Sequence, residues 1–288
     1  MHLGLIGRHY VMIDKNISLF LFPDAKQIVV CGDIHGDFNL LVHKMCITYD
    51  MHDTLLIVAG DCGFGFENKG YYDNIVRRNS GRMNSYNNWI VFFRGNHDNP
   101  AYFDSKVFAH KRFLAVPDYS VIEAYGHHVL CIGGAISIDR RYRKEWQKNP
   151  KHHIDRSCAL APNVYWENEA PVYNEELLGK IGEYYQIDTV VTHSAPSFCE
   201  LLSKNGLDDW AQQDKSLLSN VACERMTMDN IYEKLKAMKM PFSKWYYGHF
   251  HQSHHESIDG ILFSMLDIME ITTLESSRMV AQEVHEMD

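Results

Sequence analysis

Five short apolar runs of this chain each lead directly into polar residues of the kinds that bind metal ions. In the first, residues 28–31 are followed by Gly32-Asp33-Ile34-His35-Gly36. Residues i and i+2 of an extended segment point to the same side, so the Asp33 carboxylate and the His35 imidazole can converge on one point. Repetition of Asp, Asn and His at the ends of apolar runs predicts a metal site. The other four runs lead into Gly60-Asp61, Gly95-Asn96-His97-Asp98, Thr192-His193 and Gly248-His249-Phe250-His251.

The donor groups in these motifs are carboxylate, carboxamide and imidazole, without a thiolate. Such a mixed oxygen and nitrogen set suits Mn, Fe, Zn or a similar divalent ion. Seven ligands are too many for one ion and suffice for two if one carboxylate bridges, and Asp61 is the natural bridge because it stands alone in its motif. Two ions about 3.5–4 Å apart can clamp a phosphoryl group and activate a bound water. The predicted chemistry is attack of hydroxide on phosphorus.

Each motif taken alone also has a simple structural explanation. A Gly-Asp pair after a strand is commonly a turn, a single histidine is commonly a hydrogen-bonded core residue, and Gly-Asn-His-Asp suits a turn. The recurrence of all five motifs at the ends of apolar runs favours the metal site. Cys31 and Cys62 stand beside candidate ligands, but a free cysteine usually packs as a small core residue, and we expect that role for both.

The apolar runs that carry the motifs are typical of buried strands. Between them the pattern predicts helices over 37–48, 71–84 and 174–185, a loop over 64–70 and short strands between 113 and 132. We expect a single domain over residues 1–288. Residues 138–170 lack periodicity and are expected to form a loop or lid near the site. Residues 197–240 are expected to form a helical insertion, followed by a closing strand over 261–268.

Composition narrows the class of protein. The formal net charge of −9 gives no electrostatic footprint for tight binding of duplex nucleic acid. The seven cysteines are scattered and never spaced as Cys-x-x-Cys, which favours a reducing compartment. No apolar run approaches the ~18 residues that a membrane-spanning helix needs. We therefore expect a cytoplasmic protein without a membrane partner.

As an ordered set, the motifs resemble those of the calcineurin-like metallophosphoesterases. The resemblance implies a four-layer αββα sandwich of two mixed β-sheets flanked by helices, with the site at strand ends. It implies two divalent metal ions, Mn being favoured and Fe, Ni, Zn and Mg being alternatives. By position in the motifs, one ion would be held by Asp33, His35 and His251, the other by Asn96, His193 and His249, and Asp61 would bridge them.

The same resemblance assigns roles beyond metal binding. His97 would contact the scissile phosphate and help to protonate the leaving oxygen. Asp98 is assigned as the residue that orients His97, so the predicted catalytic residues are His97, Asp61 and Asp98. Protein Ser/Thr phosphatases of the family continue the second motif as Gly-Asp-x-x-Asp-Arg-Gly, whereas this chain has Gly-Asp-Cys-Gly-Phe-Gly-Phe over residues 60–66 and lacks that phosphate-binding arginine.

Residues 133–140, Gly-Gly-Ala-Ile-Ser-Ile-Asp-Arg, resemble a bacterial and phage branch of the family. A replacement for the missing arginine could come from Arg140, Arg141 or Arg143, since guanidinium suits bidentate phosphate binding. Solvated surface charges are an equally good interpretation of these three residues.

Three functions are compatible with this sequence. The favoured one is a phosphoesterase with phosphomonoesterase or protein-phosphatase-like activity, whose substrate is a small molecule, a nucleotide or a phosphopeptide. The alternative is a nucleotide phosphodiesterase or nuclease. A non-catalytic interaction scaffold on the same fold is disfavoured, because every ligand position of the motifs is filled.

Overall fold

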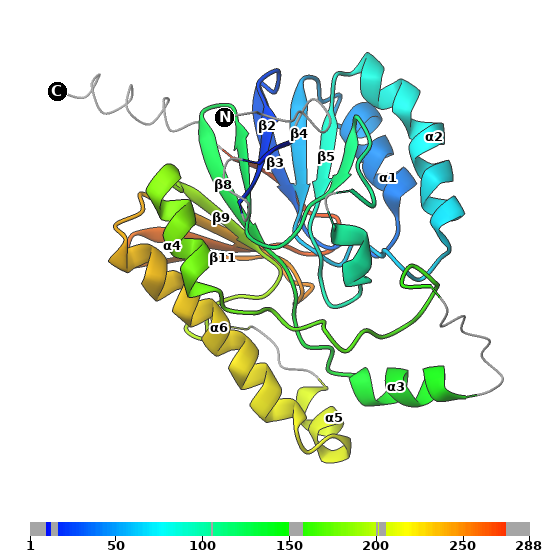
Figure 1. Ribbon diagram of the computed structural model, residues 1–288, viewed down its shortest axis with the longest axis vertical. Helices are drawn as coiled ribbons and strands as arrows, with labels where there is room; N and C mark the ends of the chain where they lie inside the picture. Colours follow the sequence, from blue (N-terminus) through cyan, green and yellow to red (C-terminus); the bar gives the residue numbers. More distant parts are fainter. Residues whose placement is uncertain are drawn as a thin grey trace.

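The computed structural model describes residues 10–12, 17–104, 106–149, 158–199, 201 and 206–274. Two β-sheets stack face to face, and helices cover the outer face of each sheet (Figure 1). The chain therefore forms four layers, helix–sheet–sheet–helix, as the sequence predicts.

The smaller sheet carries the first three motifs. It has five strands in the order β13-β3-β4-β5-β6, and β3 to β6 are parallel while β13 is antiparallel to β3. The expected strands before Asp33, Asp61 and Asn96 are all present. The strands are β3 (Gln27–Cys31), β4 (Thr54–Val58), β5 (Trp89–Phe92), β6 (Phe113–Ala115) and β13 (Ile271–Leu274).

The larger sheet carries the last two motifs. It has eight strands in the order β1-β2-β7-β8-β9-β10-β12-β11, in which β8, β9, β10 and β12 are mutually parallel. The strands expected before His193 and His249 are β9 and β10. The bounds are β1 (Tyr10–Met12), β2 (Ser18–Phe22), β7 (Ser120–Ala124), β8 (His127–Ile132), β9 (Thr189–Thr192), β10 (Lys244–Tyr247), β11 (His254–Ile258) and β12 (Ile261–Met265).

The helices divide between the two outer faces and one end of the molecule. α1 and α2 pack on the five-stranded sheet, and α4 and α6 pack on the eight-stranded sheet. α3 and α5 lie at the lower end of the view in Figure 1. The predicted helix over 37–48 is present as α1 continued by a π-helical turn, η1. The bounds are α1 (Phe38–His43), η1 (Lys44–Thr48), α2 (Lys69–Ser85), η2 (Pro100–Phe103), α3 (Arg140–Lys148), α4 (Glu175–Tyr184), α5 (Leu207–Gln213) and α6 (Leu217–Ala237).

The buried side chains form three clusters that correspond to the three contacts between layers. Along β3, Ile28 and Val30 belong to the cluster between the sheets, whereas Val29 and Cys31 belong to the cluster under α1 and α2. Strands buried on both faces need apolar residues at every position, which explains the unbroken apolar runs of the sequence. The predicted sandwich of two mixed sheets is confirmed.

Residues 138–170 contain a helix that the sequence pattern does not reveal. α3 shows no apolar stripe in its sequence. Ion pairs of Arg140 with Asp214 and of Arg143 with Asp139 hold it in place, and its Tyr142 side chain is exposed. Residues 150–157 of the predicted lid lie outside the described residues, and the lid remains a prediction. In the parts of the chain that the structure describes, no helix combines the length and apolarity needed to cross a membrane.

Candidate metal centre and adjoining cavity

The predicted metal ligands lie at one end of the sandwich, where strands of both sheets finish. Asp33, Asp61 and Asn96 follow the carboxyl ends of β3, β4 and β5 of the smaller sheet. His193 and the pair His249 and His251 follow β9 and β10 of the larger sheet. Face-to-face stacking of the sheets therefore brings residues more than 200 positions apart into one site.

One group of donor atoms contains Asp33, His35, Asp61 and His251, each offering an atom within 4.8 Å of the others. The Nε2 atom of His251 lies 3.0 Å from Asp33 Oδ2 and 3.0 Å from the Nε2 atom of His35. These are the residues that the motifs assign to the first ion, together with the assigned bridge.

A second group contains Asp61, His193 and His249, with the same 4.8 Å limit between donor atoms. The Nε2 atom of His193 lies 3.1 Å from Asp61 Oδ1 and 2.9 Å from Asn96 Oδ1. Asp61 is common to the two groups, as expected of a bridging carboxylate. The structure thus brings together all seven side chains that the sequence predicts as ligands.

The orientation of these side chains makes atoms with lone pairs face one another. The Nδ1 atom of His193 lies 2.7 Å from the carbonyl oxygen of Ala59, so this N–H donates and Nε2 is left as the lone-pair atom of the neutral ring. That atom faces oxygens of Asp61 and Asn96, which are acceptors as well. Lone pairs that converge in a buried site need a proton or a metal ion between them, and this set of carboxylate, carboxamide and imidazole donors fits divalent metal ions.

The charges of the site shift pKa values in the directions expected for acid–base pairs. Burial raises the pKa of the Asp61 carboxyl, but the charges of His193 and His97 outweigh burial and hold that pKa well below its usual value. Burial lowers the pKa of His193, but Asp61 and Asp33 outweigh it and raise the pKa to about 10. Burial, followed by the charge of His193, lowers the pKa of His249 well below the usual histidine value.

Several ligands sit on backbone in a rarely populated conformation. His35, Asp61, His249 and His251 have φ angles of 44°, 44°, 72° and 50°. Such left-handed conformations cost about 1–3 kcal/mol each in a residue other than glycine and cluster at functional sites. The motif glycines accommodate the crowding: a Cβ on Gly95 would collide with the Asp61 carboxylate.

Asp98 fastens two of the ligand loops through the backbone. Its Oδ1 atom accepts from the N–H groups of Gly63 and Phe64, both at 2.8 Å, and its Oδ2 atom accepts from those of Cys62 (2.9 Å) and Gly95 (2.8 Å). Burial, followed by the charge of Asp61, raises the pKa of Asp98 to about 6. Because both oxygens hold the main chain, the contacts of Asp98 indicate that it positions the loops, and they give no sign that it orients His97.

A hydrogen-bond chain fixes the carboxamide of Asn96. The Nδ2 group of Asn96 donates to Ser137 Oγ at 2.9 Å, and that hydroxyl donates to Glu169 Oε2 at 2.6 Å. The amide oxygen must therefore face His193 and the metal site. Glu169 is held in turn by Arg94, whose Nη1 group donates to the carbonyl of Glu169 at 2.7 Å while its Nε donates to Asp118. The sequence motifs include Ser137 but give no signal for Glu169.

The three arginines proposed for phosphate binding have different surroundings. Arg143 places Nη2 at 3.1 Å from His97 Nε2, and its Nε is 2.8 Å from both carboxylate oxygens of Asp139. Arg140 is buried against Asp214 and Ser216, and Arg141 is exposed beside Glu145. Only Arg143 of the three lines the cavity at the metal centre.

His97 lies between Arg143 and the carboxylate of Asp61. Its backbone N–H donates to Asp61 Oδ1 at 2.7 Å, and its Nδ1 atom is 3.8 Å from Asp61 Oδ2. Burial lowers the pKa of His97, and the charge of Arg143 adds to this effect while Asp61 opposes it. His97 Nε2 and the Arg143 guanidinium therefore share the rim of the site.

Cys31 and Cys62 are fully buried in the apolar cluster under the helices, the position that we expect for core cysteines.

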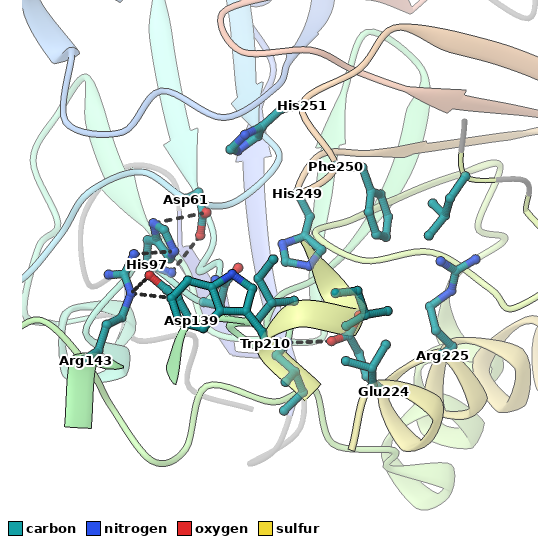
Figure 2. A pocket seen from close by; sticks show the side chains of 16 residues that line it. Asp61, His97, Asp139, Arg143, Trp210, Glu224, Arg225, His249, Phe250 and His251 are labelled. Atoms are coloured by element: carbon teal, nitrogen blue, oxygen red, sulfur yellow. Dashed lines mark hydrogen bonds and ion pairs between the residues drawn. The ribbon is translucent and has the colours of Figure 1, made fainter. Parts of the chain in front are cut away.

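A cavity of about 420 Å³ opens beside the metal centre (Figure 2). One side of this cavity is polar and includes Asp61, His97, Arg143, His249 and His251. The opposite side includes residues of α5 and α6 and Phe250, which stands between His249 and His251. Sequence analysis singles out none of those residues. The additional lining residues are Asn96, Ile136, Ile138, Asp139, Leu201, Leu207, Trp210, Val221, Glu224, Arg225 and Phe250.

Comparison with known proteins assigns the family. The model of the calcineurin-like phosphoesterase family matches residues 26–219, which is more than half of the chain. The chain therefore belongs to the calcineurin-like phosphoesterases, as the motifs predict. The match includes all predicted ligands except His249 and His251, which lie beyond residue 219. A search of curated proteins finds no match.

Two solved structures are among those similar to this chain. One is a protein assigned as a 5'-nucleotidase from Staphylococcus aureus in complex with alpha-ketoglutarate, with 13% sequence identity, a TM-score of 0.40 and coverage of 88% of this chain. This chain spans about half, 51%, of that protein. The other is the phosphopantetheinyl hydrolase from Mycobacterium tuberculosis, with 12% identity, a TM-score of 0.33 and coverage of 85% of this chain and 91% of that one.

The contacts of Asp98 predict a large effect on stability. Asp98→Ala leaves four buried N–H groups without their acceptor, and we expect the free energy of unfolding to fall by about 3 kcal/mol. Urea denaturation of the chelator-treated protein measures this change. Glu233→Ala, which removes an exposed carboxylate within the helix α6, is the control and should change stability by about 0.5 kcal/mol or less. A loss below about 1 kcal/mol for Asp98→Ala would refute the fastening role.

The contacts of Ser137 predict a selective effect on metal binding. Ser137→Ala frees the Asn96 carboxamide to rotate, so the affinity of the site that contains Asn96 should fall by about 10–100-fold while the other site is unchanged. Competition with a fluorescent chelator measures the two affinities separately. Ser80→Ala, which removes a hydroxyl bound to the Val76 carbonyl on α2, is the control. Equal affinities in Ser137→Ala and the unsubstituted protein would contradict this positioning role.

Proposed function

We propose that this calcineurin-like phosphoesterase hydrolyses a small phosphomonoester with two divalent metal ions. Asp33, His35 and His251 would hold one ion, Asn96, His193 and His249 would hold the other, and Asp61 would be a ligand of both. The observation that carries this proposal is the pair of donor groups that share Asp61. Among divalent ions Mn is favoured, because the set combines hard carboxylates with imidazoles and has no thiolate.

The chain's own residues divide the work around those ions. When bound, two divalent ions supply positive charge for the phosphoryl oxygens and acidify water to a pKa of about 7. The ligand loops would hold the ions beside the cavity, which Asp61, Asn96, His249 and His251 line. Arg143 and His97 face the same space from the rim, where a phosphate can accept from the guanidinium in place of the present 3.1 Å contact with His97.

His97 is placed to act on the leaving oxygen. Its ring lies at the cavity wall, and its backbone N–H is tied to the bridging carboxylate, so its distance from the metal centre is fixed. A histidine in hydrogen-bond reach of the leaving oxygen supplies a proton and typically contributes 10²–10⁴-fold to the rate. Arg143 takes the part of the phosphate-binding arginine that the second motif lacks.

A monoester is favoured over a diester by the number of positive groups. Two divalent ions would bring four positive charges, of which the carboxylates of Asp33 and Asp61 offset two, and Arg143 adds one, so the phosphoryl position has a positive excess that suits the two negative charges of a monoester. A nucleotide phosphodiesterase is the alternative, and relative turnover of mono-aryl and bis-aryl phosphates distinguishes the two.

The compartment we propose is the cytoplasm, because all seven cysteines are free, as in a reducing environment.

Metal dependence is the first test of this function. Protein stripped by chelator should be inactive on aryl phosphates and recover activity when Mn is added back, with Fe, Ni, Zn and Mg compared in parallel. Asp61→Ala should lower kcat/KM by at least about 10³-fold with every metal, because it removes a ligand of both ions. Hydrolysis by the metal-loaded Asp61→Ala variant at the unsubstituted rate would overturn the proposal.

Two arginines of α3 form a matched pair for the second test. Arg143→Ala removes the guanidinium at the cavity rim and should lower kcat/KM for a monoester by about 10²-fold or more, comparable to the loss of a single preorganised donor. Arg141→Ala removes an exposed guanidinium two residues earlier and should stay within about 2-fold, since surface ion pairs contribute little. Equal losses in both variants would contradict the role of Arg143.

A further inference from the structure

The cavity beside the metal centre has an apolar wall that hydrolysis of a phosphate group alone does not require. Six half-buried apolar side chains form this wall, and Trp210 on α5 is the largest of them (Figure 2). Half-buried apolar groups that face a cavity have surface left for a ligand to cover. The wall consists of Ile138, Leu201, Leu207, Trp210, Val221 and Phe250.

This apolar wall is tied to the metal centre by Phe250. Phe250 stands between the predicted ligands His249 and His251, and its ring centroid is 4.8 Å from that of His249. The Arg225 guanidinium lies 5.4 Å from the Phe250 ring on another side. A group that packs on this wall is therefore held next to the phosphoryl position, where the organic part of a phosphate ester must lie.

The charged residues of this side are already engaged. Both oxygens of Glu224 accept hydrogen bonds, one from Ser194 Oγ and the other from the backbone N–H of Ile136. Arg225 donates through Nη2 to the carbonyls of Pro196 and Cys199. Its Nε–H is buried and has no partner among the described residues. Arg225 is the one cation among the residues that line this side, and it is buried against those carbonyls, so the side offers no exposed cation to a second anionic group.

From these observations we infer that the apolar wall is the leaving-group subsite, and that it selects phosphomonoesters of an uncharged alcohol carrying a flat, apolar group. Trp210 is the specificity-determining residue, because an aromatic face buries a large flat area at low entropic cost. The cavity of about 420 Å³ is the size of a small-molecule site. This inference rests on the proposed phosphomonoesterase function.

Two esters with similar leaving-group chemistry test the subsite. In 2-phenylethyl phosphate and ethyl phosphate the leaving group is a primary alcohol, and the two differ chiefly in the phenyl group. We expect kcat/KM of the metal-loaded protein to be about 30-fold or more higher for 2-phenylethyl phosphate. Trp210→Ala should remove at least about 10-fold of this preference and leave ethyl phosphate within about 3-fold, whereas Trp210→Phe should keep most of the preference.

Controls separate the subsite from folding and from the reaction itself. Tyr142→Ala removes an exposed aromatic residue of α3 outside the cavity and should preserve the preference. Inhibition by 2-phenylethylphosphonate, compared with ethylphosphonate, repeats the measurement without turnover. Equal kcat/KM for the two esters, or a preference unchanged in Trp210→Ala, would overturn the subsite while the proposed function stands. Absence of turnover with both esters, despite bound metal, would instead overturn the proposed function.

Discussion

The site depends on the convergence of lone-pair atoms on one buried carboxylate. Asp61 stands at the carboxyl end of β4, with His193 from the other sheet at 3.1 Å and the His35 and His251 rings in the neighbouring group. These groups repel one another unless protons or cations lie between them. A divalent ion bound at each group would resolve the conflict, and a carboxylate common to both groups is therefore central to the site.

The fold maintains this unfavourable arrangement through hydrogen bonds of the main chain. Asp98 binds four N–H groups in two ligand loops, and Arg94 binds the carbonyls of residues 168–170 that carry Glu169. Neither side chain belongs to the proposed set of metal ligands. The backbone groups, and for Arg94 also the Asp118 carboxylate, compensate their buried charges, and these contacts hold the loops in place. Catalytic geometry in this protein is thus supported by residues that the substrate need not touch.

The sequence reveals the parts of the site whose signals are local. An apolar run that ends in Gly-Asp or Gly-His predicts both a strand and the position of its ligand, and every such strand is present. The apolar runs give no information about tertiary contacts between segments that are distant in the sequence. Nothing in the spacing connects Ser137 with Glu169, or separates Arg143 from Arg140 and Arg141. α3 and the apolar wall escape prediction for the same reason, since contacts with distant segments, and not an apolar period, define them.

The most direct test of the shared carboxylate is the electron paramagnetic resonance spectrum of the protein loaded with Mn²⁺. Two ions about 3.5–4 Å apart, joined by one carboxylate, should give the multiline spectrum of an exchange-coupled pair. Asp61→Asn should convert it to the spectrum of isolated Mn²⁺. Two bound ions with uncoupled spectra in the unsubstituted protein would contradict the account, because Asp61 would then not join two sites.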